Sequence, residues 1–341
     1  MKALMYLGPR NMPMQDIPEP VVQDGEVKIK VTYCGICGSD IHGYSGSTGR
    51  KIPPMIMGHE FCGTVAELGA GVTGFTIGQR VVVLPVESCG TCPQCRAGLT
   101  NICQNRRGLG VMDVNGAFTE YICFSAKYVY PLPDSLSDVE ATLLEPLAVA
   151  FHAVRSAQPV EGKNVMLIGA GTIGQLILKC LALYGCKTVI ASDVVDTHLQ
   201  KALENGADVV VNPMDREKMD QTLREHGLLG NIDVTIEAVG ATPTVQQSID
   251  YVANHGRVVW VGNAAKMVEI NMQSVVTREV FLRGSYAYDA ADFEQCLKLM
   301  AERKLDVTNI ISGVVNLDEV SGVMDQVLDK KIDVFKVVAK I

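Results

Sequence analysis

The sequence predicts an α/β protein with two domains, one built on a doubly wound parallel sheet and the other rich in β-strands. The chain has 341 residues, more than a single hydrophobic core usually supports. Short strands separated by glycines fill its first third, whereas strands and helices alternate from residue 164 onward. We expect the β-rich domain to comprise residues 1–150 and 286–341, and the parallel-sheet domain to comprise residues 151–285.

The composition favours a soluble, cytoplasmic protein that binds neither nucleic acid nor membranes. The net charge is −8, and no long run of Lys or Arg suggests a nucleic-acid surface. No stretch approaches the roughly eighteen apolar residues of a membrane-spanning helix, and Met1–Tyr6 does not begin a signal-peptide pattern. The eleven cysteines are odd in number and four of them cluster, which favours metal binding in a reducing compartment over disulfides.

The first strand is expected at residues 26–34, where polar and apolar residues alternate, and it leads directly to Cys37. Two further short strands, at residues 61–69 and 78–83, indicate a compact and partly barrel-like domain. Cys37, His59 and Glu60 offer a thiolate, an imidazole and a carboxylate, which are the three ligand types of zinc. Because a catalytic zinc needs only three protein ligands, we interpret them as an open site that handles a substrate oxygen.

Four cysteines follow in the pattern Cys-x2-Cys-x2-Cys-x7-Cys, at Cys89, Cys92, Cys95 and Cys103. Four thiolates on a short loop close a tetrahedron around zinc, and such a site is structural because no position is left for substrate. Ligation of an iron–sulfur cluster is the alternative interpretation of this spacing.

A helix is expected after Ser137, which resembles an N-cap followed by acidic residues and an apolar run at helical spacing. Glu145 lies in the middle of that apolar run, beside Pro146. A carboxylate in such a place must reach solvent, form a pair or bind a ligand. An exposed glutamate near a helix kink is the alternative.

Residues 164–168 form a continuous apolar run, followed at once by the pattern Gly-x-Gly-x-x-Gly, an apolar-periodic helix, and a second strand at 188–192. In this context the glycines let the backbone approach a pyrophosphate, and an acid at the end of the second strand accepts from a ribose hydroxyl. The carboxyl ends of later strands should hold the nicotinamide half. The expected cofactor-binding residues are Gly169, Gly171, Thr172, Ile173, Gly174, Asp193, Val261 and Gly262.

Asp193 also favours NAD over NADP, since a carboxylate there repels a 2′-phosphate. Asp196 adds to the repulsion, and no arginine lies among residues 194–200. His198 is the one local group able to turn cationic, so some use of NADP stays open.

Further strands at 208–212, 233–237 and 256–262 complete the expected parallel sheet, and a late strand at 281–286 is a candidate for pairing across a dimer. The remaining segment is expected to pack back on the first domain. It contains helical patterns around residues 293–299 and 320–328 and a last strand at 334–338.

Taken together, these motifs resemble the zinc-dependent medium-chain dehydrogenases of the alcohol dehydrogenase superfamily, over essentially the whole chain. Where the alcohol enzymes place a second cysteine ligand, this sequence has Glu145, which resembles the polyol (sorbitol-like) and sugar-acid branch. The resemblance implies a GroES-like catalytic domain with a structural zinc lobe at about residues 86–106, and an NAD-binding Rossmann domain. It also implies two zinc ions per subunit and a homo-oligomer, either a dimer or a tetramer.

Site roles follow from the same resemblance. Cys37 and His59 match the metal ligands, while Glu60 is either a third ligand or exchanges on and off, and Glu145 either binds the metal or holds its water. Ser39 resembles the hydroxyl that first takes the substrate proton, and His42 matches the residue that passes it to solvent. The metal would lower the pKa of a substrate hydroxyl, and NAD would accept the hydride from the same carbon.

The substrate expected from this resemblance is a polyol or a sugar-derived secondary alcohol, with a sugar acid (hexonate 5-dehydrogenation) or a small diol as alternatives. Sorbitol-like enzymes carry an arginine where this chain has Ala287, which weakens the case for sorbitol itself. Two rival classes are a zinc-free quinone reductase, which lacks the four-cysteine lobe, and a nucleotide-binding or zinc-buffering protein without catalysis.

Overall fold

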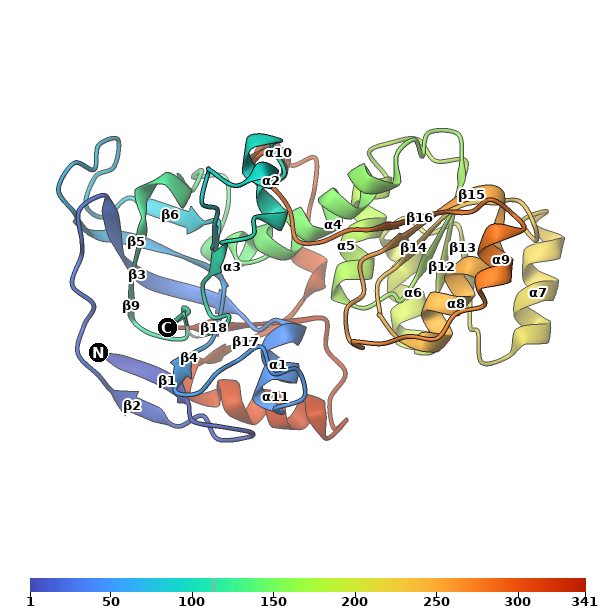
Figure 1. Ribbon diagram of the computed structural model, residues 1–341. Helices are drawn as coiled ribbons and strands as arrows, with labels where there is room; N and C mark the ends of the chain where they lie inside the picture. The colour runs from blue at the N-terminus through green and yellow to red at the C-terminus, as the bar shows by residue number, and fades with distance from the viewer. Residues whose placement is uncertain (113) are drawn as a thin grey trace. The chain divides into compact units, whose positions relative to one another are not determined.

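The computed structural model describes residues 1–112 and 114–341, which form two compact units (Figure 1). Unit 1 comprises Met1–Glu145 and Asp289–Ile341, and unit 2 comprises Pro146–Tyr288. The sequence-based boundaries at 150/151 and 285/286 differ from these divisions by a few residues. The chain therefore leaves unit 1 once, builds unit 2 without interruption, and returns.

Unit 1 is organised around a sheet in which β10, β6, β5, β3, β18 and β17 follow one another and β9 also pairs with β3. Strand β3 is central because it pairs antiparallel with β5, β9 and β18. Its side chains at Val27, Ile29 and Val31 are buried, as the alternating sequence predicts. The strands are β3 (Glu26–Gly35), β5 (Glu60–Leu68), β6 (Arg80–Val83), β9 (Tyr121–Ser125), β10 (Val129–Pro131), β17 (Ile311–Asn316) and β18 (Lys336–Lys340).

Smaller elements complete unit 1, and the sequence patterns did not indicate most of them. They include a three-stranded sheet in the order β2-β1-β4 and a two-stranded pair of β7 with β8. Their short lengths leave too few residues for a periodic pattern to stand out. They are β1 (Lys2–Tyr6), β2 (Met14–Asp16), β4 (Met55–Ile56), β7 (Val86–Glu87), β8 (Arg107–Gly108), α1 (Gly38–Tyr44), α2 (Pro93–Arg96), α3 (Asp138–Ala141), α10 (Ala290–Ala301) and α11 (Val320–Leu328).

Unit 2 is a six-stranded, all-parallel sheet in the order β13-β12-β11-β14-β15-β16. The strand order reverses between β11 and β14, and ligands of such sheets bind at the carboxyl ends of strands beside this switch point. The strands are β11 (Asn164–Ile168), β12 (Thr188–Ser192), β13 (Val209–Val211), β14 (Ile232–Glu237), β15 (Val252–Trp260) and β16 (Phe281–Gly284).

Helices cover this sheet, with α5 packed on β11, α6 on β12 and β13, and α8 on β14 and β15. One core cluster joins β11, β12 and β13 to α7 through Met166, Ile190, Val209 and Leu223, all of them buried. The helices are α4 (Leu144–Ala157), α5 (Thr172–Leu181), α6 (Asp196–Glu204), α7 (Arg216–Glu225), α8 (Thr242–Tyr251) and α9 (Met272–Val276). Among the helices that the structure describes, none is long and apolar enough to cross a membrane.

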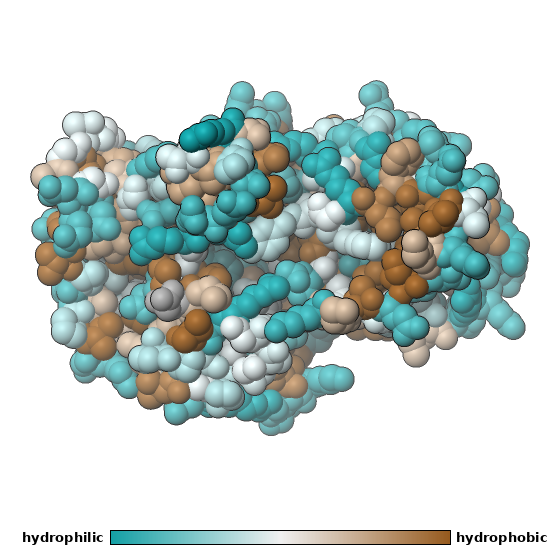
Figure 2. Space-filling model, viewed as in Figure 1, coloured by the Kyte–Doolittle hydropathy of each residue, from teal (hydrophilic) through white to brown (hydrophobic). Residues whose placement is uncertain are grey.

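Strand β16 forms one edge of the parallel sheet, and its neighbours along the chain expose hydrophobic side chains. Phe281 is 52% exposed, Val276 61% and Met272 70%. Figure 2 shows hydrophobic residues gathered over this part of unit 2. An unpaired edge strand with apolar neighbours is a template for pairing with another chain.

Candidate active site

Cys37 lies at the N-cap of α1, directly after β3. Its Sγ accepts hydrogen bonds from the backbone N–H of Ser39 at 3.4 Å and from the Ser39 hydroxyl at 3.3 Å. In return, the Asp40 carboxylate accepts from the N–H of Cys37 at 3.4 Å, which completes a capping box. These hydrogen bonds fix the position of the sulfur at the start of α1.

His59 and Glu60 meet Cys37 because β5 pairs with the end of β3, where Glu60 stands opposite Gly35. The ligand atoms of Cys37, His59 and Glu60 all lie within 4.8 Å of one another. A thiolate, an imidazole and a carboxylate at this separation fit an open zinc site of three protein ligands. The structure thus brings together the three residues that the sequence singled out.

Glycines make this approach possible. A Cβ at Gly35 would lie 2.3 Å from Glu60 Oε2, so a larger residue would displace the carboxylate. Gly58 has φ +93 and a Cβ there would lie 2.9 Å from the Sγ of Cys34.

Lys336, on β18, holds the carboxylate of Glu60. Its Nζ lies 2.8 Å from Oε1 and 2.6 Å from Oε2, and it also donates to the carbonyl of Ile36 at 3.1 Å. The Lys336 and Glu60 side chains are 3% and 1% exposed. Burial lowers the pKa of Lys336, but the charges of Glu60, Cys37 and Glu145 outweigh it and raise the pKa. No sequence pattern indicated Lys336 as part of the site.

Glu145 is half-buried in the first turn of α4 and is not among the three residues whose ligand atoms cluster. Its charge nevertheless contributes to the raised pKa of Lys336. Glu145 is therefore a second carboxylate whose charge favours the protonated form of the lysine that pairs with Glu60.

Asp40 is fully buried, and its Oδ2 lies 3.6 Å from Nδ1 of His59. Burial raises the pKa of Asp40, but the charges of Lys51 and His59 overcome this and lower it. For His59, burial lowers the pKa, while Asp40 and Cys37 raise it to well above its usual value. A carboxylate behind a metal-binding histidine orients the ring, so Asp40 belongs to the site although the sequence analysis did not select it.

Ser39 and His42 lie three residues apart on α1 and are both exposed. Residues at this spacing share one face of a helix. The two predicted proton-handling residues are therefore neighbours on the surface that adjoins Cys37.

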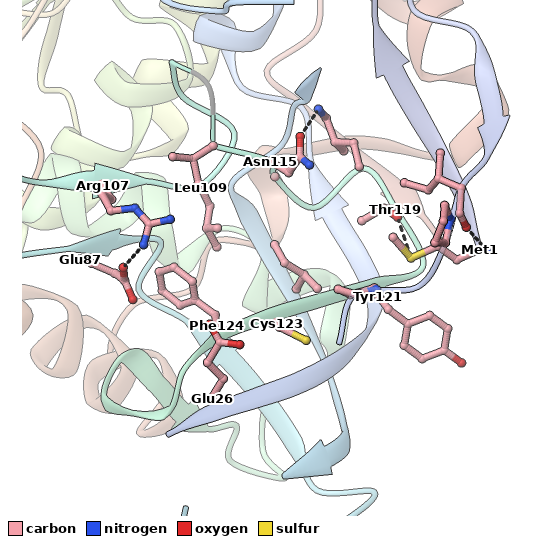
Figure 3. Close-up of a pocket in the computed structure, with 17 residues that line it drawn as sticks. Met1, Glu26, Glu87, Arg107, Leu109, Asn115, Thr119, Tyr121, Cys123 and Phe124 are labelled. Carbon is pink, nitrogen blue, oxygen red and sulfur yellow. Dashed lines mark hydrogen bonds and ion pairs between the residues drawn. The ribbon is translucent and has the colours of Figure 1, made fainter. Parts of the chain in front are cut away.

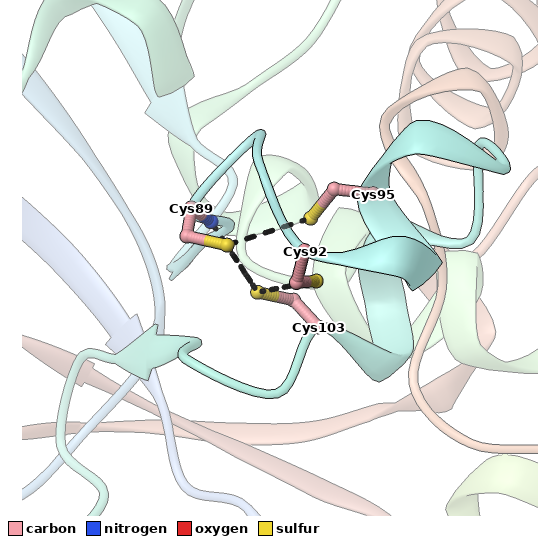
Figure 4. A group of neighbouring side chains, drawn as sticks. All are labelled: Cys89, Cys92, Cys95 and Cys103. Atoms are coloured by element: carbon pink, nitrogen blue, oxygen red, sulfur yellow. Dashed lines mark hydrogen bonds between the residues drawn. The ribbon is translucent and has the colours of Figure 1, made fainter.

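The four cysteines Cys89, Cys92, Cys95 and Cys103 converge, as Figure 4 shows. The sulfur–sulfur distances are 4.0 Å for Cys89–Cys95, 3.9 Å for Cys92–Cys103 and 3.4 Å for Cys103–Cys89. A tetrahedral zinc with bonds of 2.3 Å requires about 3.8 Å between sulfurs. The observed spacing fits a closed, structural metal site.

The thiols of this lobe resist ionising together. Hydrogen bonds from the backbone N–H groups of Thr91 and Cys92 lower the pKa of Cys89 to about 5. Burial and the sulfurs of Cys92 and Cys103 raise the pKa of Cys95 to about 11. A divalent cation would remove this conflict by stabilising all four thiolates.

Cys103→Ser is expected to lose one zinc ion per chain on dialysis against a weak chelator, because a hydroxyl replaces a buried thiolate ligand. Zinc analysis of the dialysed protein measures the loss. Cys123→Ser, on β9 and outside the lobe, is the matched control and should keep its zinc. Equal zinc contents in the two variants would show that the lobe does not bind the metal.

The glycine-rich loop of unit 2 joins β11 to α5 and lies at the switch point of the sheet. Gly169 has φ +90, and a Cβ at Gly174 would lie 2.0 Å from its carbonyl oxygen, so α5 packs directly on the loop. A Cβ at Gly171 would meet nothing within 4 Å, which leaves that backbone open. Thr172 and Ile173 then begin α5, whose N-terminus suits a phosphate.

Asp193 follows β12 and turns back toward this loop. Its Oδ2 accepts from the N–H of Ala170 at 2.6 Å, and its Oδ1 accepts from the N–H of Val195 at 2.9 Å. Burial raises the pKa of Asp193, but hydrogen bonds from His198, Val195 and Ala170 lower it by more than burial raises it. The carboxylate form is therefore favoured. The acid is thus charged and fixed beside the loop.

Val261 and Gly262 follow β15 at the same edge of the sheet. Their N–H groups donate to the carbonyl of Glu237 at 2.8 and 3.0 Å. The buried Glu237 side chain also accepts from the N–H of Gly240 at 2.7 Å and from the hydroxyl of Thr244 at 2.7 Å. Glu237 therefore organises the loops at the carboxyl ends of β14 and β15, a role that the sequence analysis did not assign.

A hollow of about 350 Å³ lies elsewhere in unit 1, as Figure 3 shows. Its lining includes Met1, Asn115, Phe124 and the ion pair of Glu87 with Arg107, whose atoms are 3.4 Å apart. None of the predicted metal-binding residues lines it. The hollow is therefore separate from the metal cluster.

A metal-binding cluster in one unit and a dinucleotide-binding loop in the other define the class of protein, a metal-dependent oxidoreductase that uses a nicotinamide cofactor. Comparison with known families specifies it further. Residues 23–134 match the alcohol dehydrogenase GroES-like domain, and residues 172–302 match the zinc-binding dehydrogenase family. The chain belongs to the zinc-dependent medium-chain dehydrogenases, as the sequence predicted.

Named relatives place the chain among dehydrogenases of sugar-related compounds. It is 35% identical to 2-dehydro-3-deoxy-L-galactonate 5-dehydrogenase of Pseudoalteromonas atlantica and 33% identical to sorbitol dehydrogenase of Halalkalibacterium halodurans, each over 94% of both chains. A Sinorhizobium meliloti structure bound to NADP is 31% identical, with a TM-score of 0.89 over 100% of this chain and 99% of the other.

Proposed function

We propose that this protein is a zinc- and NAD-dependent dehydrogenase that interconverts a secondary hydroxyl of a polyol or sugar-derived substrate and the corresponding ketone. The observation that carries the proposal is the cluster of Cys37, His59 and Glu60, in which a carboxylate stands beside the thiolate and imidazole. The names of the relatives, a sorbitol dehydrogenase and a sugar-acid dehydrogenase, support the same substrate class.

Each subunit would hold two zinc ions, one bound by the four-cysteine lobe and one by Cys37, His59 and Glu60. The grouping of these three side chains favours Glu60 as the third ligand and leaves Glu145 to act beside it. When bound, the catalytic zinc supplies a Lewis acid that favours ionisation of the substrate hydroxyl. Asp40 orients His59, and Lys336 balances the charge of Glu60.

The protein's own groups would then carry the proton away. The Ser39 hydroxyl lies 3.3 Å from Sγ of Cys37 and would accept the proton of the substrate hydroxyl while releasing its own. His42, one turn later on the exposed face of α1, would accept that proton and release it to water. The hydride would pass from the same carbon to the nicotinamide ring.

NAD is the proposed cofactor, because the fixed carboxylate of Asp193 would accept from the ribose hydroxyl and repel a 2′-phosphate. Asp193→Asn is expected to lower the preference for NAD over NADP by about tenfold or more, which corresponds to about 1.4 kcal/mol. Dissociation constants for NADH and NADPH, measured on the same variant, give the ratio. Asp196→Asn, an exposed neighbour, is the control with a smaller expected effect.

An unchanged NAD to NADP ratio in Asp193→Asn would contradict the role of this carboxylate. The NADP bound to the Sinorhizobium meliloti relative makes the measurement necessary, since that relative is similar to this chain over its whole length.

The proposed class includes two candidate substrate types, sugar alcohols and sugar acids. Ala287, with φ +48, offers no cationic side chain where sorbitol-like enzymes carry arginine. A sugar acid is the second candidate, favoured by the relative that oxidises a galactonate derivative. A screen of sugar alcohols, aldonates and small diols with NAD, followed by the absorbance of NADH, should give activity on at least one secondary alcohol. No activity on the whole panel with zinc-replete protein would contradict the proposal.

The exposed edge at β16 supports a homo-oligomer in which two parallel sheets join edge to edge. Cytoplasmic location completes the proposal, in keeping with a cluster of four cysteines suited to metal binding in a reducing compartment.

A further inference from the structure

We propose that Lys51 is a positioning residue for the catalytic metal, acting through Asp40 to hold the imidazole of His59 in place. The inference rests on the proposed function in one respect only, that Cys37, His59 and Glu60 bind a metal. It adds a residue that lies eight positions before His59 and contacts none of the three ligands in the hydrogen bonds and ion pairs described.

Lys51 is buried and has hydrogen-bonding partners for its ammonium group. Its side chain is 3% exposed, and its Nζ lies 2.6 Å from Oδ1 of Asp40, whose side chain is 0% exposed. The same ammonium donates to the carbonyl of Gly110. A buried charge is costly unless it is paired and hydrogen-bonded, and this lysine meets both conditions.

The path of the lysine side chain depends on Gly43, on helix α1. A Cβ at Gly43 would lie 2.3 Å from Cγ and 3.0 Å from Cε of Lys51, so the stem crosses the helix where no side chain stands. This passage brings the ammonium to Oδ1 of Asp40, whereas His59 faces Oδ2. The position of the charge is therefore set by packing as well as by attraction.

Asp40 connects Lys51 to two of the metal-binding residues. While Oδ1 accepts from Lys51, Oδ2 accepts from the N–H of Cys37 at 3.4 Å and lies 3.6 Å from Nδ1 of His59. With Lys51 bound to Oδ1, the other oxygen of the carboxylate faces Cys37 and His59. Such partners behind a ligand typically change metal affinity by about 10- to 100-fold when removed.

Lys51 also joins the site to the segment that leaves the four-cysteine lobe. Its neighbour Ile52 donates to the carbonyl of Met112 at 2.9 Å, and Met112 donates to the carbonyl of Arg50 at 2.8 Å. Gly110, which accepts from Lys51, lies two residues after β8. Hydrogen bonds of both chain neighbours of Lys51 and of its own ammonium thus fix the lysine beside Asp40.

The test compares Lys51→Met with the unchanged protein after selective removal of the catalytic metal and titration with Zn²⁺ or Co²⁺. Methionine keeps most of the stem and removes the charge. We expect metal affinity at the catalytic site to fall about 10- to 100-fold, with an altered visible spectrum of the Co²⁺ form. Zinc in the four-cysteine lobe and NADH affinity should be unchanged. Lys304→Met, an exposed lysine of unit 1, is the matched control.

A double-mutant cycle with Asp40→Asn separates positioning from a general loss of stability. If Lys51 acts through Asp40, the double variant should lose little more metal affinity than Asp40→Asn alone, whereas independent effects would add. Should Lys51→Met fail to fold, Gly43→Ala displaces the lysine stem without changing any charge and should also weaken metal binding.

Undiminished metal affinity in Lys51→Met, or additive losses in the cycle, would overturn the inference and leave the proposed function standing. Absence of any metal binding at the Cys37 site of the unchanged protein would overturn both. No substrate is needed for these titrations, so a wrong substrate assignment does not affect their outcome.

Discussion

Cys37→Ala is expected to lower turnover by about 1,000-fold or more while leaving the affinity for NADH within about twofold. The loss follows because Cys37 supplies the thiolate of the three-residue metal cluster, and Lewis-acid stabilisation contributes several kcal/mol at 1.36 kcal/mol per tenfold in rate. NADH affinity should be unchanged because the glycine-rich loop belongs to unit 2 and Cys37 to unit 1. Steady-state rates and NADH titration measure the two quantities.

Cys123→Ala is the matched control, since this half-buried thiol on β9 lies outside both cysteine clusters. Full activity in Cys37→Ala would refute the catalytic assignment. Loss of NADH affinity together with turnover would instead show that the substitution damages the fold.

Lys336→Met is expected to lower the free energy of unfolding by about 3 kcal/mol or more, because removing one partner of a buried ion pair leaves the other charge uncompensated. Glu60 has both carboxylate oxygens bonded to this one lysine, at 2.8 and 2.6 Å. The midpoint of urea unfolding, measured after the catalytic metal is removed, reports the change.

Two controls accompany Lys336→Met. Lys336→Arg keeps the charge and should recover part of the loss, while Lys304→Met removes an exposed ion pair and should change the stability little. Equal stability of Lys336→Met and Lys304→Met would mean that the Glu60 carboxylate does not depend on Lys336.

The parallel-sheet unit was accessible from the sequence because its signals are local. The apolar run at 164–168 coincides with β11, and the glycine pattern and Asp193 stand next to the strands that position them. The four cysteines were equally accessible, since thiols at short spacing have few other uses. In each case, a few consecutive residues both form the secondary structure and supply the groups that bind the ligand.

Local patterns did not reveal the residues behind the metal ligands. Lys336 is 276 positions from Glu60, and in a strand of alternating residues it resembles a solvent-facing lysine. Only the pairing of β18 with β3 brings it to the cluster. Lys51 and Asp40 were missed for a related reason, because isolated charges are usually exposed and burial is a property of the tertiary fold.

The ends of some helices and strands differ from those expected from the sequence, because helix caps and strand pairing determine them. The helix expected at 293–299 begins at Ala290, because Asp289 accepts from the N–H of Asp292 and caps it. The last strand, expected at 334–338, occupies Lys336–Lys340, where it pairs with β17 and β3. A pattern of apolar residues does not reveal such caps and strand pairs, so it does not predict where these elements begin and end.

Hydride transfer is tested directly by following the hydrogen from substrate to cofactor. A secondary alcohol selected by the substrate screen is prepared with deuterium on the carbon that bears the reacting hydroxyl, and the reduced cofactor is analysed by mass spectrometry. Hydride transfer predicts one deuterium in each NADH formed, and loss of the label-bearing product in Cys37→Ala. Deuterium released to water, or unlabelled NADH, would contradict the account.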